Sequence, residues 1–518
     1  MAADLPPAAP PDPPAVVAPA PAAAETIYVD TDEYHYSVLG NTLLPRETIE
    51  AAIKSAKTPK DALDALNRAY VDAGYFLVVI GGEVDKKLVA FRVLQGRIAE
   101  IEAPDDLRPY FKGIYNRSDL TQSTLIRDSA LAEIYSSRQG VRPKGTFSPS
   151  KEIGGTKLTV VEEEIPDAKP WAAGLAFNNL GGRFSSRYTW GASGSVRPGG
   201  GLELTGTYTQ GIPGLTSESA GASYKIGTLG ASLVTPWGIY ALNYSQTQYQ
   251  IGEAGAPVFP AGTVEFGGIT GTQLVYSDAT TRFVLTEGLT RYSNVQSVFD
   301  GLSDIVDQNY TVGNVGAAYN RNFSLLGQNS SFGATVTVAK GFSARSGTFL
   351  PADLGIPDPH FILGQGSVTG TFGLPYGLSA GIAINGQYTS FVLPQSQQWV
   401  LGGFGNLSAW LPAVLIGDSG ALGRVTLSSP TWQWSTFTFN ASGFGEAGMS
   451  RLEQRGAGEP YTRALGDAGF SISGNTAKGT SLTLAYAWPV WYRNIDGIVR
   501  DNVDRNRANL YFTLNQSF

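Results

Sequence analysis

From Trp171 to the C-terminus, apolar residues alternate with small or polar residues at a period of two. The segments 202–209, 332–338 and 481–488 show the pattern most clearly, because every second residue is mostly Leu, Val, Phe, Tyr or Trp and those between are mainly Gly, Ala, Ser or Thr. This alternation places neighbouring side chains on opposite faces of an extended strand. A soluble β-sandwich or propeller would alternate too, but its inner face would be a packed Val/Leu/Ile core. The small, polar second face predicts an antiparallel transmembrane β-barrel with a wet interior.

The length of this region predicts the size of the barrel. The 348 residues that begin at Trp171, at roughly 20–22 residues for each strand and its loop, give about 16 strands. Glycine supplies 63 of 518 residues, well above the roughly 7% of average usage. Aromatic residues make up 11% and charged residues only 16%. No apolar run approaches the roughly 18 residues of a membrane helix, and Trp410–Ile416 is among the longest.

The composition argues against several kinds of active site. The chain has no cysteine and two histidines, His35 and His360, which lie far apart in the sequence. A thiolate or histidine metal site and a Ser-His-Asp triad are therefore poorly supported. The sequence contains no HExxH or P-loop pattern. The formal net charge of −7 argues against a nucleic-acid partner. We expect no catalytic residue, no metal and no cofactor, hence no enzyme.

The region before Trp171 has the sequence pattern of small soluble modules. Residues 1–25 are rich in Pro and Ala, which predicts a flexible segment without a stable helix. We recognise no signal peptide in it. Residues 26–97 read as a β-α-α-β-β module. Its expected elements are a strand over Ile27–Val38, helices over Arg46–Ala56 and from Pro59 to Gly74, and strands over Tyr75–Ile80 and Leu88–Leu94, with Gly81-Gly82 beginning the last connection.

A second, less regular copy follows at 98–168. It would contain a strand over Ile98–Ala103, an amphipathic helix over Thr124–Ser137, and strands over Val141–Phe147 and Lys157–Glu163. The order of elements and the segments LGNTLLP, AGYFLVVI and VLQGRIAEI in the first copy resemble a polypeptide-transport-associated (POTRA) domain. An unrelated small α+β domain is the alternative. The predicted chain is thus two α+β modules followed by an all-β barrel over 169–518.

One stretch interrupts the alternating strands. Gln398–Pro430 is low in charge and rich in glycine and aromatic residues. It contains Gly402 and Gly403, then after three residues Leu407, Ser408, Ala409 and Trp410, and later Gly417 and Asp418. This layout resembles the GG-xxx-VRGY-…-GD block of two-partner secretion transporters of the haemolysin-activator type. The resemblance implies a loop, around 398–423, that folds back into the barrel lumen. Ser408 stands where the family has an arginine.

A second motif lies in a predicted strand. Phe444, Glu446 and Gly448 resemble the FxDxG strand motif of the same family. Counting by two places Glu446 on the polar face of its strand, and a carboxylate facing lipid would cost several kcal/mol. We therefore predict that Glu446 points into the lumen. In the family, the loop arginine pairs with this acid and holds the loop inside the barrel.

Ser408 supplies no charge to such a pair, although its hydroxyl can donate one hydrogen bond. Two interpretations stay open. In the first, Trp410 and its apolar neighbours anchor the loop by packing, while another basic residue, Arg424, faces Glu446. In the second, the loop no longer gates and the barrel is a degenerate or repurposed member of the family.

The C-terminal segment alternates as well. Leu510, Phe512, Leu514 and Phe518 fall on one face, and Phe518 is the last residue. This pattern resembles the C-terminal signal that the outer-membrane assembly machinery reads.

Together these resemblances imply a transporter in a bacterial outer membrane, with the POTRA modules in the periplasm. Its partners would be a secreted client protein, outer-membrane lipid or lipopolysaccharide, and the barrel-assembly machinery, and the protein would be a monomer. The POTRA modules would bind the unfolded client, and the barrel would form the pore. A passive channel or porin and an outer-membrane protein assembly factor are the alternatives.

Overall fold

The computed structural model describes most of the chain. The described residues are 25–183, 185–216, 219–252, 260–298, 303–348, 357–453, 461–495 and 497–518. The Pro- and Ala-rich segment predicted at 1–25 therefore lies almost wholly outside the described residues. Two compact units divide the chain: the first is Met1–Glu100, Tyr115–Gln122 and Phe147–Leu158, and the second is Ile101–Ile114, Ser123–Thr146 and Thr159–Phe518. Among the described residues, no helix combines the length and apolar character needed to cross a bilayer.

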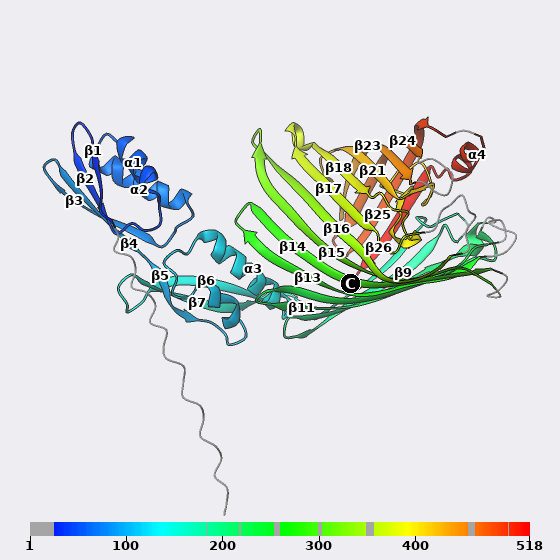
Figure 1. Ribbon diagram of the computed structural model, residues 1–518, viewed down its shortest axis with the longest axis horizontal. Coiled ribbons are helices and arrows are strands. Elements are labelled where there is room, and N and C mark those ends of the chain that lie inside the picture. Colours follow the sequence, from blue (N-terminus) through cyan, green and yellow to red (C-terminus); the bar gives the residue numbers. More distant parts are fainter. Residues whose placement is uncertain are drawn as a thin grey trace, which may run out of the picture. The chain divides into compact units, whose positions relative to one another are not determined.

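The first unit holds a four-stranded sheet in the order β1-β2-β4-β3 with two helices (Figure 1). Its elements are β1 Ile27–Asp30, β2 His35–Leu39, α1 Arg46–Lys54, α2 Pro59–Asp72, β3 Val78–Asp85 and β4 Leu88–Gln95. The strand predicted over Ile27–Val38 is in fact a hairpin, because Thr31 and Tyr34 bond each other across a tight turn. Gly81 and Gly82 lie inside β3 rather than in the connection. The turn falls instead at Lys86, whose φ is 53°.

The core of this sheet explains why the helices form where they do. Thr58 and Asp61 make a capping box at the start of α2, which satisfies its first free N–H groups. The buried side chains of α2 include Leu66 and Tyr70. The Tyr70 hydroxyl donates to Asn41 Oδ1 at 2.6 Å, and burial raises the pKa of this phenol well above its usual range. The helix is thereby fixed to the turn at Asn41.

A three-stranded sheet in the order β5-β7-β6 follows. Its elements are β5 Arg97–Glu102, η1 Arg108–Ile114, α3 Gln122–Arg138, β6 Val141–Pro149 and β7 Gly155–Glu164. The predicted strands and the helix are all present, and α3 extends the helix predicted over Thr124–Ser137 at both ends. The 3-10 helix η1 was not predicted. It buries Tyr110, Phe111 and Ile114. The segment is short and lacks helical periodicity, so its sequence gives no basis for predicting this helix.

Sixteen antiparallel strands of the described chain close into a barrel (Figure 1), as the sequence predicts. They are β8 Trp171–Asn178, β9 Thr189–Gly199, β10 Leu202–Gly211, β11 Ser223–Thr235, β12 Gly238–Gln250, β13 Ala261–Ser277, β14 Thr281–Val298, β15 Ser303–Leu325, β16 Gln328–Thr348, β17 Ile362–Gly373, β18 Ser379–Tyr388, β21 Ser419–Ser428 with its continuation β22 Trp432–Trp434, β23 Phe437–Leu452, β24 Tyr461–Thr476, β25 Thr480–Arg493 and β26 Leu510–Ser517. The last strand pairs with the first, β26 with β8.

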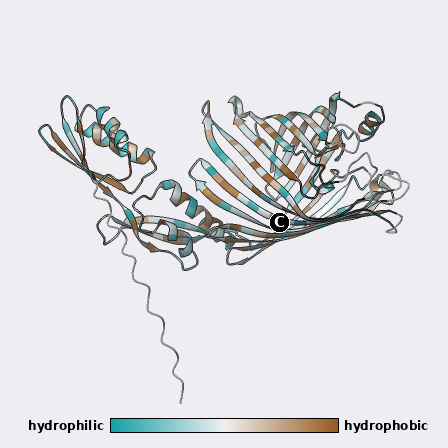
Figure 2. Cartoon of the chain, viewed as in Figure 1, coloured by the Kyte–Doolittle hydropathy of each residue, from teal (hydrophilic) through white to brown (hydrophobic). Residues whose placement is uncertain are grey.

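Hydrophobic and hydrophilic residues alternate along the barrel strands (Figure 2), and the two faces of the wall differ accordingly. Large apolar side chains such as Leu229, Leu242 and Val336 are exposed on the outside. On the inside, hydroxyl groups face each other across neighbouring strands, including Thr228 with Ser245 at 3.0 Å. The expectation that this inner face never packs an apolar core is wrong for part of the wall. There the loop between β18 and β21 brings its own apolar side chains, as described next.

Candidate functional site

The connection from β18 to β21 folds into the barrel. It contains two short strands, β19 Trp399–Leu401 and β20 Leu415–Gly417, which pair with each other. Its apolar side chains form one buried cluster with inward residues of the wall: Leu401, Leu407, Ala409, Trp410 and Leu415 from the loop, and Leu422, Phe444, Leu465 and Ala487 from β21, β23, β24 and β25. This contact explains how the loop stays inside, since burial of these side chains removes apolar surface from water.

Two glycines shape the tip of the loop. Gly402 and Gly403 have φ values of 108° and 100°, a region open to glycine and strained for other residues. A Cβ on Gly402 would lie 2.2 Å from the carbonyl oxygen of Leu411. The two N–H groups donate to the carbonyls of Asn406 at 2.7 Å and Trp410 at 2.8 Å. The glycine pair therefore folds 402–411 into a compact turn that presents the next residues to the wall.

Two carboxylates of the wall receive this turn. The Ser408 N–H donates to Glu446 Oε2 at 2.6 Å, and the next N–H, of Ala409, donates to Asp467 Oδ2 at 2.6 Å. Glu446 on β23 and Asp467 on β24 are directly opposite each other in register. Both are buried, with exposed fractions of 4% each. Consecutive backbone N–H groups thus bind the acids at the position where the family has its arginine.

The Ser408 side chain has a different role from the one considered above. Its Oγ accepts a hydrogen bond from the Gly405 N–H at 2.9 Å, so it holds the turn together rather than reaching Glu446. The reason is local: Leu407 has a φ of 68°, which turns the following two N–H groups, and not the hydroxyl, toward the wall.

Arg424 supplies the cation. It lies opposite Glu446 in the β21–β23 register, and its Nη1 donates to Glu446 Oε1 at 2.5 Å. Its guanidinium lies 4.3 Å from the ring centroid of Phe444, within range of a cation–π interaction. The prediction that Arg424 faces Glu446 is confirmed. We call Arg424, Glu446 and Asp467, with the N–H groups of Ser408 and Ala409, the anchor cluster.

Asp467 was missed by the sequence analysis. A signal was present, because Asp467 is the one acidic residue in β24 and stands between two small residues. Counting by two from Leu465 places it on the same face as that buried leucine. An acid at an inward position of a neighbouring strand could therefore have been paired with Glu446, had the strand order been used.

Trp410 fixes the far side of the turn. Its side chain is fully buried and meets Tyr492 edge to face at 5.8 Å. Its carbonyl accepts from the Tyr511 hydroxyl at 2.5 Å. The neighbouring backbone pairs with the segment that precedes β26, through Leu411 N–H to Asn506 O at 2.8 Å and Ala508 N–H to Ala409 O at 3.0 Å. Packing and backbone pairing together hold this side of the loop.

Asp418 ties the end of the loop to the wall. It is fully buried, and its two carboxylate oxygens accept from Leu393 N–H at 2.9 Å and Glu453 N–H at 3.0 Å. The preceding Gly417 passes so near β23 that a Cβ would lie 2.8 Å from Arg451 N. At Gly448 a Cβ would lie 3.0 Å from Leu407 Cδ1, so this glycine leaves room for the loop.

Structure comparison places this arrangement among known folds. CdiB from Escherichia coli matches with a TM-score of 0.75 and 16% identity, over 98% of this chain and 93% of that one. CdiB from Acinetobacter baumannii matches with a TM-score of 0.69 and 12% identity, over 95% and 90% of the two chains. The chain has the fold of CdiB. No protein-family model and no curated protein matches its sequence.

A helix that was not predicted covers the loop of this CdiB-like barrel. α4, Gly497–Arg505, lies in the connection between β25 and β26, and Val503 joins the buried cluster of the loop. Asp504 accepts from Arg500 Nε at 3.0 Å and Arg507 Nη2 at 2.8 Å. The i,i+4 pair of Arg500 and Asp504 is the signal from which this helix could have been predicted.

The C-terminal strand has the predicted facing. Leu510 and Leu514 are exposed on the outside of the CdiB-like barrel, whereas Tyr511 between them is buried. Phe512 packs on Phe177 of β8 at 5.4 Å. Phe518 lies just past β26, and its N–H donates to Ala173 O at 3.0 Å. Reading of this strand by assembly machinery stays a prediction.

Within the second unit, α3 is bonded to turns of the barrel. Arg138 Nη1 donates to the carbonyls of Gly201 at 2.7 Å and Ser232 at 2.8 Å, and its Nη2 lies 3.3 Å from Glu203. The Tyr110 hydroxyl donates to Val234 O at 3.1 Å. Among the described residues, no group of three or more His, Cys, Asp or Glu side chains is placed to hold a metal.

Proposed function

We propose that this chain is an outer-membrane translocator of the two-partner secretion family, which exports a large unfolded client through its barrel. Two kinds of support agree. The loop and strand motifs around Ser408 and Glu446 resemble those of the family, and the fold is that of CdiB, which belongs to it. In this proposal the modules at 26–97 and 98–168 lie in the periplasm and bind the client, and the apolar outer face of the barrel lies in the membrane.

The observation that carries the proposal is the anchored loop. An exported chain and the loop would share one lumen, so the loop has to shift for the client to pass. The anchor cluster suits a reversible hold, since it binds the loop by two backbone hydrogen bonds and by packing rather than by a covalent link. Export of this kind requires no bond chemistry, and we propose no enzymatic activity.

The loop stays bound to the barrel wall although the family arginine is absent. Arg424 neutralises Glu446 from the wall, and the loop contributes the N–H groups of Ser408 and Ala409. This arrangement favours a gating loop over a degenerate channel. A passive channel and an assembly factor differ from the proposal in a testable way, because neither has to export a dedicated client.

A reversible lock of the loop tests the proposal. The chain contains no cysteine, so a pair introduced as Leu407→Cys and Gly448→Cys would be its only thiols. These positions are in contact, with Leu407 Cδ1 3.0 Å from a Cβ built at Gly448. The measurement is secretion of a co-expressed two-partner client protein, from cells kept oxidised and from cells treated with a reductant.

We expect secretion to stop when the pair is oxidised and to return on reduction, while the Leu407→Cys variant alone secretes under both conditions. Equal secretion by the oxidised and reduced double variant, with the disulfide verified by a gel shift, would refute a gating loop. Correct insertion of the barrel without any secreted client would favour a passive channel.

A further inference from the structure

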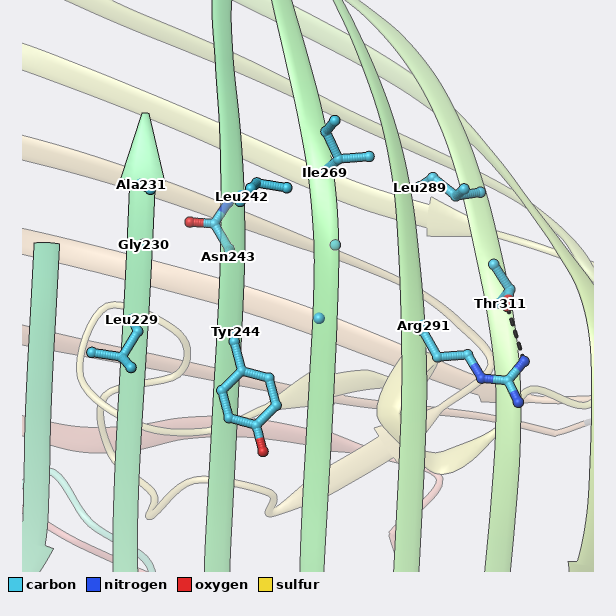
Figure 3. A pocket seen from close by; sticks show the side chains of 12 residues that line it. Leu229, Gly230, Ala231, Leu242, Asn243, Tyr244, Ile269, Leu289, Arg291 and Thr311 are labelled. Atoms are coloured by element: carbon cyan, nitrogen blue, oxygen red, sulfur yellow. Dashed lines mark hydrogen bonds between the residues drawn. The ribbon is translucent and has the colours of Figure 1, made fainter. Parts of the chain in front are cut away.

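A groove runs along the outside of the barrel wall, away from the loop. It has a volume of about 670 Å³ and crosses β11 to β15 (Figure 3). Its sides are formed by Leu229, Leu242, Tyr244, Ile269 and Leu289. Leu229 and Leu242 have exposed fractions of 66% and 60%. The depression is shallow and its lining is mostly apolar, with Arg291 and Thr311 as polar groups.

An outward-facing glycine forms part of the groove floor. Gly267 on β13 stands at an outward position, directly opposite Tyr244 on β12 and Arg291 on β14. A Cβ added at Gly267 would meet only ordinary contacts, the nearest being Tyr244 Cδ2 at 3.6 Å. The floor is therefore recessed by missing side chains rather than by a bend of the wall. This leaves a shallow apolar depression along which an acyl chain can lie.

An arginine lies at one side of the groove. Arg291 is exposed, and its Nη1 donates to Thr311 Oγ1 at 3.1 Å (Figure 3). A cation on the lipid-facing side is costly at the bilayer midplane and nearly neutral at the interfaces. Arg291 follows the tight turn at Asp278–Thr280 by ten strand positions of β14. At the usual rise and tilt these span about 24 Å, close to the apolar band of about 25 Å.

Arg291 is the charged residue among those that line the groove itself. A second depression adjoins the groove across Ile269 and Leu289 and contains Glu287 and Lys340. Glu287 accepts from Gln273 Nε2 at 3.4 Å. The wider outward patch carries two cations, Arg291 and Lys340, and two carboxylates, Glu287 and Glu265. Arginine binds phosphate through paired, charge-assisted hydrogen bonds, so a phosphorylated lipid matches both the apolar floor and the charge.

We propose that this outer groove binds the lipid A part of lipopolysaccharide, with one acyl chain on the glycine floor and a phosphate on Arg291. The choice of lipid rests on the proposed function, since it takes the tight turns as the periplasmic side and so puts Arg291 at the outer leaflet. Lipid A carries phosphate at that level, and its several acyl chains fit a wall that exposes leucine on both sides of the groove.

Lipid binding by the purified full chain tests the site. The chain in detergent is titrated with bis-phosphorylated lipid A, and bound lipid is counted by native mass spectrometry. We expect Arg291→Gln to weaken binding by about tenfold, the effect of losing a charge-assisted contact. Gly267→Leu, which fills the floor but keeps the arginine, should weaken binding by a similar factor. Arg321→Gln is the matched control, because Arg321 is an exposed arginine at the turn end of β15, beside the same wall.

Three outcomes would overturn the site: unchanged binding by Arg291→Gln, equal losses in Arg291→Gln and Arg321→Gln, or phosphatidylglycerol bound as tightly as lipid A. The first outcome would show that Arg291 does not bind the phosphate. The second would show that binding is not specific to the groove, and the third that the groove does not select lipid A. The readout is independent of export. If the groove does not bind lipid A, the secretion proposal is unaffected. If the chain binds lipid A but exports no client, only the secretion proposal is rejected.

Discussion

The barrel has two unlike walls. Along β21 to β25 the inner face is buried against the loop and carries Leu422, Phe444 and the anchor cluster. Along β11 to β17 the described inner face carries facing hydroxyls such as Thr335 and Ser367, 2.6 Å apart. A smaller apolar cluster on β15 to β17, with Tyr310, Val312 and Leu363, packs against Leu393 of the same connection. On that second wall the charges of the groove, Arg291 and Lys340, lie on the outside instead. The same period-two alternation therefore serves a dry interface on one wall and a polar conduit on the other.

The difference comes from what each wall contacts. The alternation decides which residues point inward. Whether an inward side chain is shielded from water depends on whether the loop between β18 and β21 packs against it. The loop excludes water from the inner face of β23 and β24, and there a charge must be paired. Inward positions that the connection does not contact, such as Thr335 and Ser367, carry small polar side chains instead. The following predictions test this contrast, in order of decreasing effect.

The largest effect is expected for Arg424→Met. This change leaves Glu446 and Asp467 buried without their cation, at a cost of about 4 kcal/mol of the free energy that holds the loop. The loop should leave the wall, so single-channel conductance in planar bilayers should rise. Arg291→Gln, a charge removed from the outside of the other wall, should leave conductance unchanged. Equal traces for Arg424→Met and the unmodified chain would break the comparison between the walls.

Glu446→Ala should have the next largest effect. It removes the acceptor of the Ser408 N–H, but Arg424 keeps Asp467 as a nearby counter-charge, so we expect a cost of about 3 kcal/mol. Limited proteolysis should cut within 402–411 faster than in the unmodified chain. Thr335→Ala, at an inward position of the other wall, serves as the control. If both variants resist protease equally, Glu446 does not hold the loop.

Gly402→Ala tests the shape of the turn rather than its charge. The backbone at Gly402 has a φ of 108°, and the new Cβ would meet the Leu411 carbonyl, which costs about 2 kcal/mol. Conductance should become unstable, with frequent openings. Gly443→Ala is the matched control, because nothing lies within 4 Å of a Cβ there. Stable, closed traces for Gly402→Ala would show that the turn tolerates a side chain.

Tyr511→Phe removes one hydrogen bond to the Trp410 carbonyl and keeps the ring. The expected loss is about 1 kcal/mol, seen as a slightly lower urea midpoint for release of the loop. Tyr486→Phe, on the outer face of β25, should not change the midpoint. An equal shift in both variants would assign the effect to the solvent or detergent rather than to the loop.

The smallest effect concerns α4 and acid. Burial of Asp504 raises its pKa, but hydrogen bonds and charges from Arg500, Arg507 and Tyr492 outweigh burial and leave the pKa below its usual value of 3.8. A lowered folded-state pKa gives stability that is present above that value and is lost as the pH falls through the folded pKa. Amide exchange in Gly497–Arg505 should therefore accelerate on acidification below about pH 4, and Asp504→Asn should remove the dependence.

Much of the loop site could be predicted from residues alone. The glycine pair, the inward Glu446 and its partner Arg424 all follow from motif spacing and from counting by two along β21 and β23. Asp467 and α4 were not predicted. Their contributions depend on which strand lies next to which, and on a connection folding back over the loop. Neither is visible in local periodicity.

The sequence by itself determined the sixteen-strand barrel, the small α/β sheets before it and the inward or outward facing of most strand residues, because alternation is a local property of each strand. Tertiary structure alone decided that the N–H groups of Ser408 and Ala409 take the place of an arginine. It also decided that Glu446 and Asp467 share one cation. Both depend on backbone φ values and strand register, which bring residues far apart in the chain within hydrogen-bonding distance.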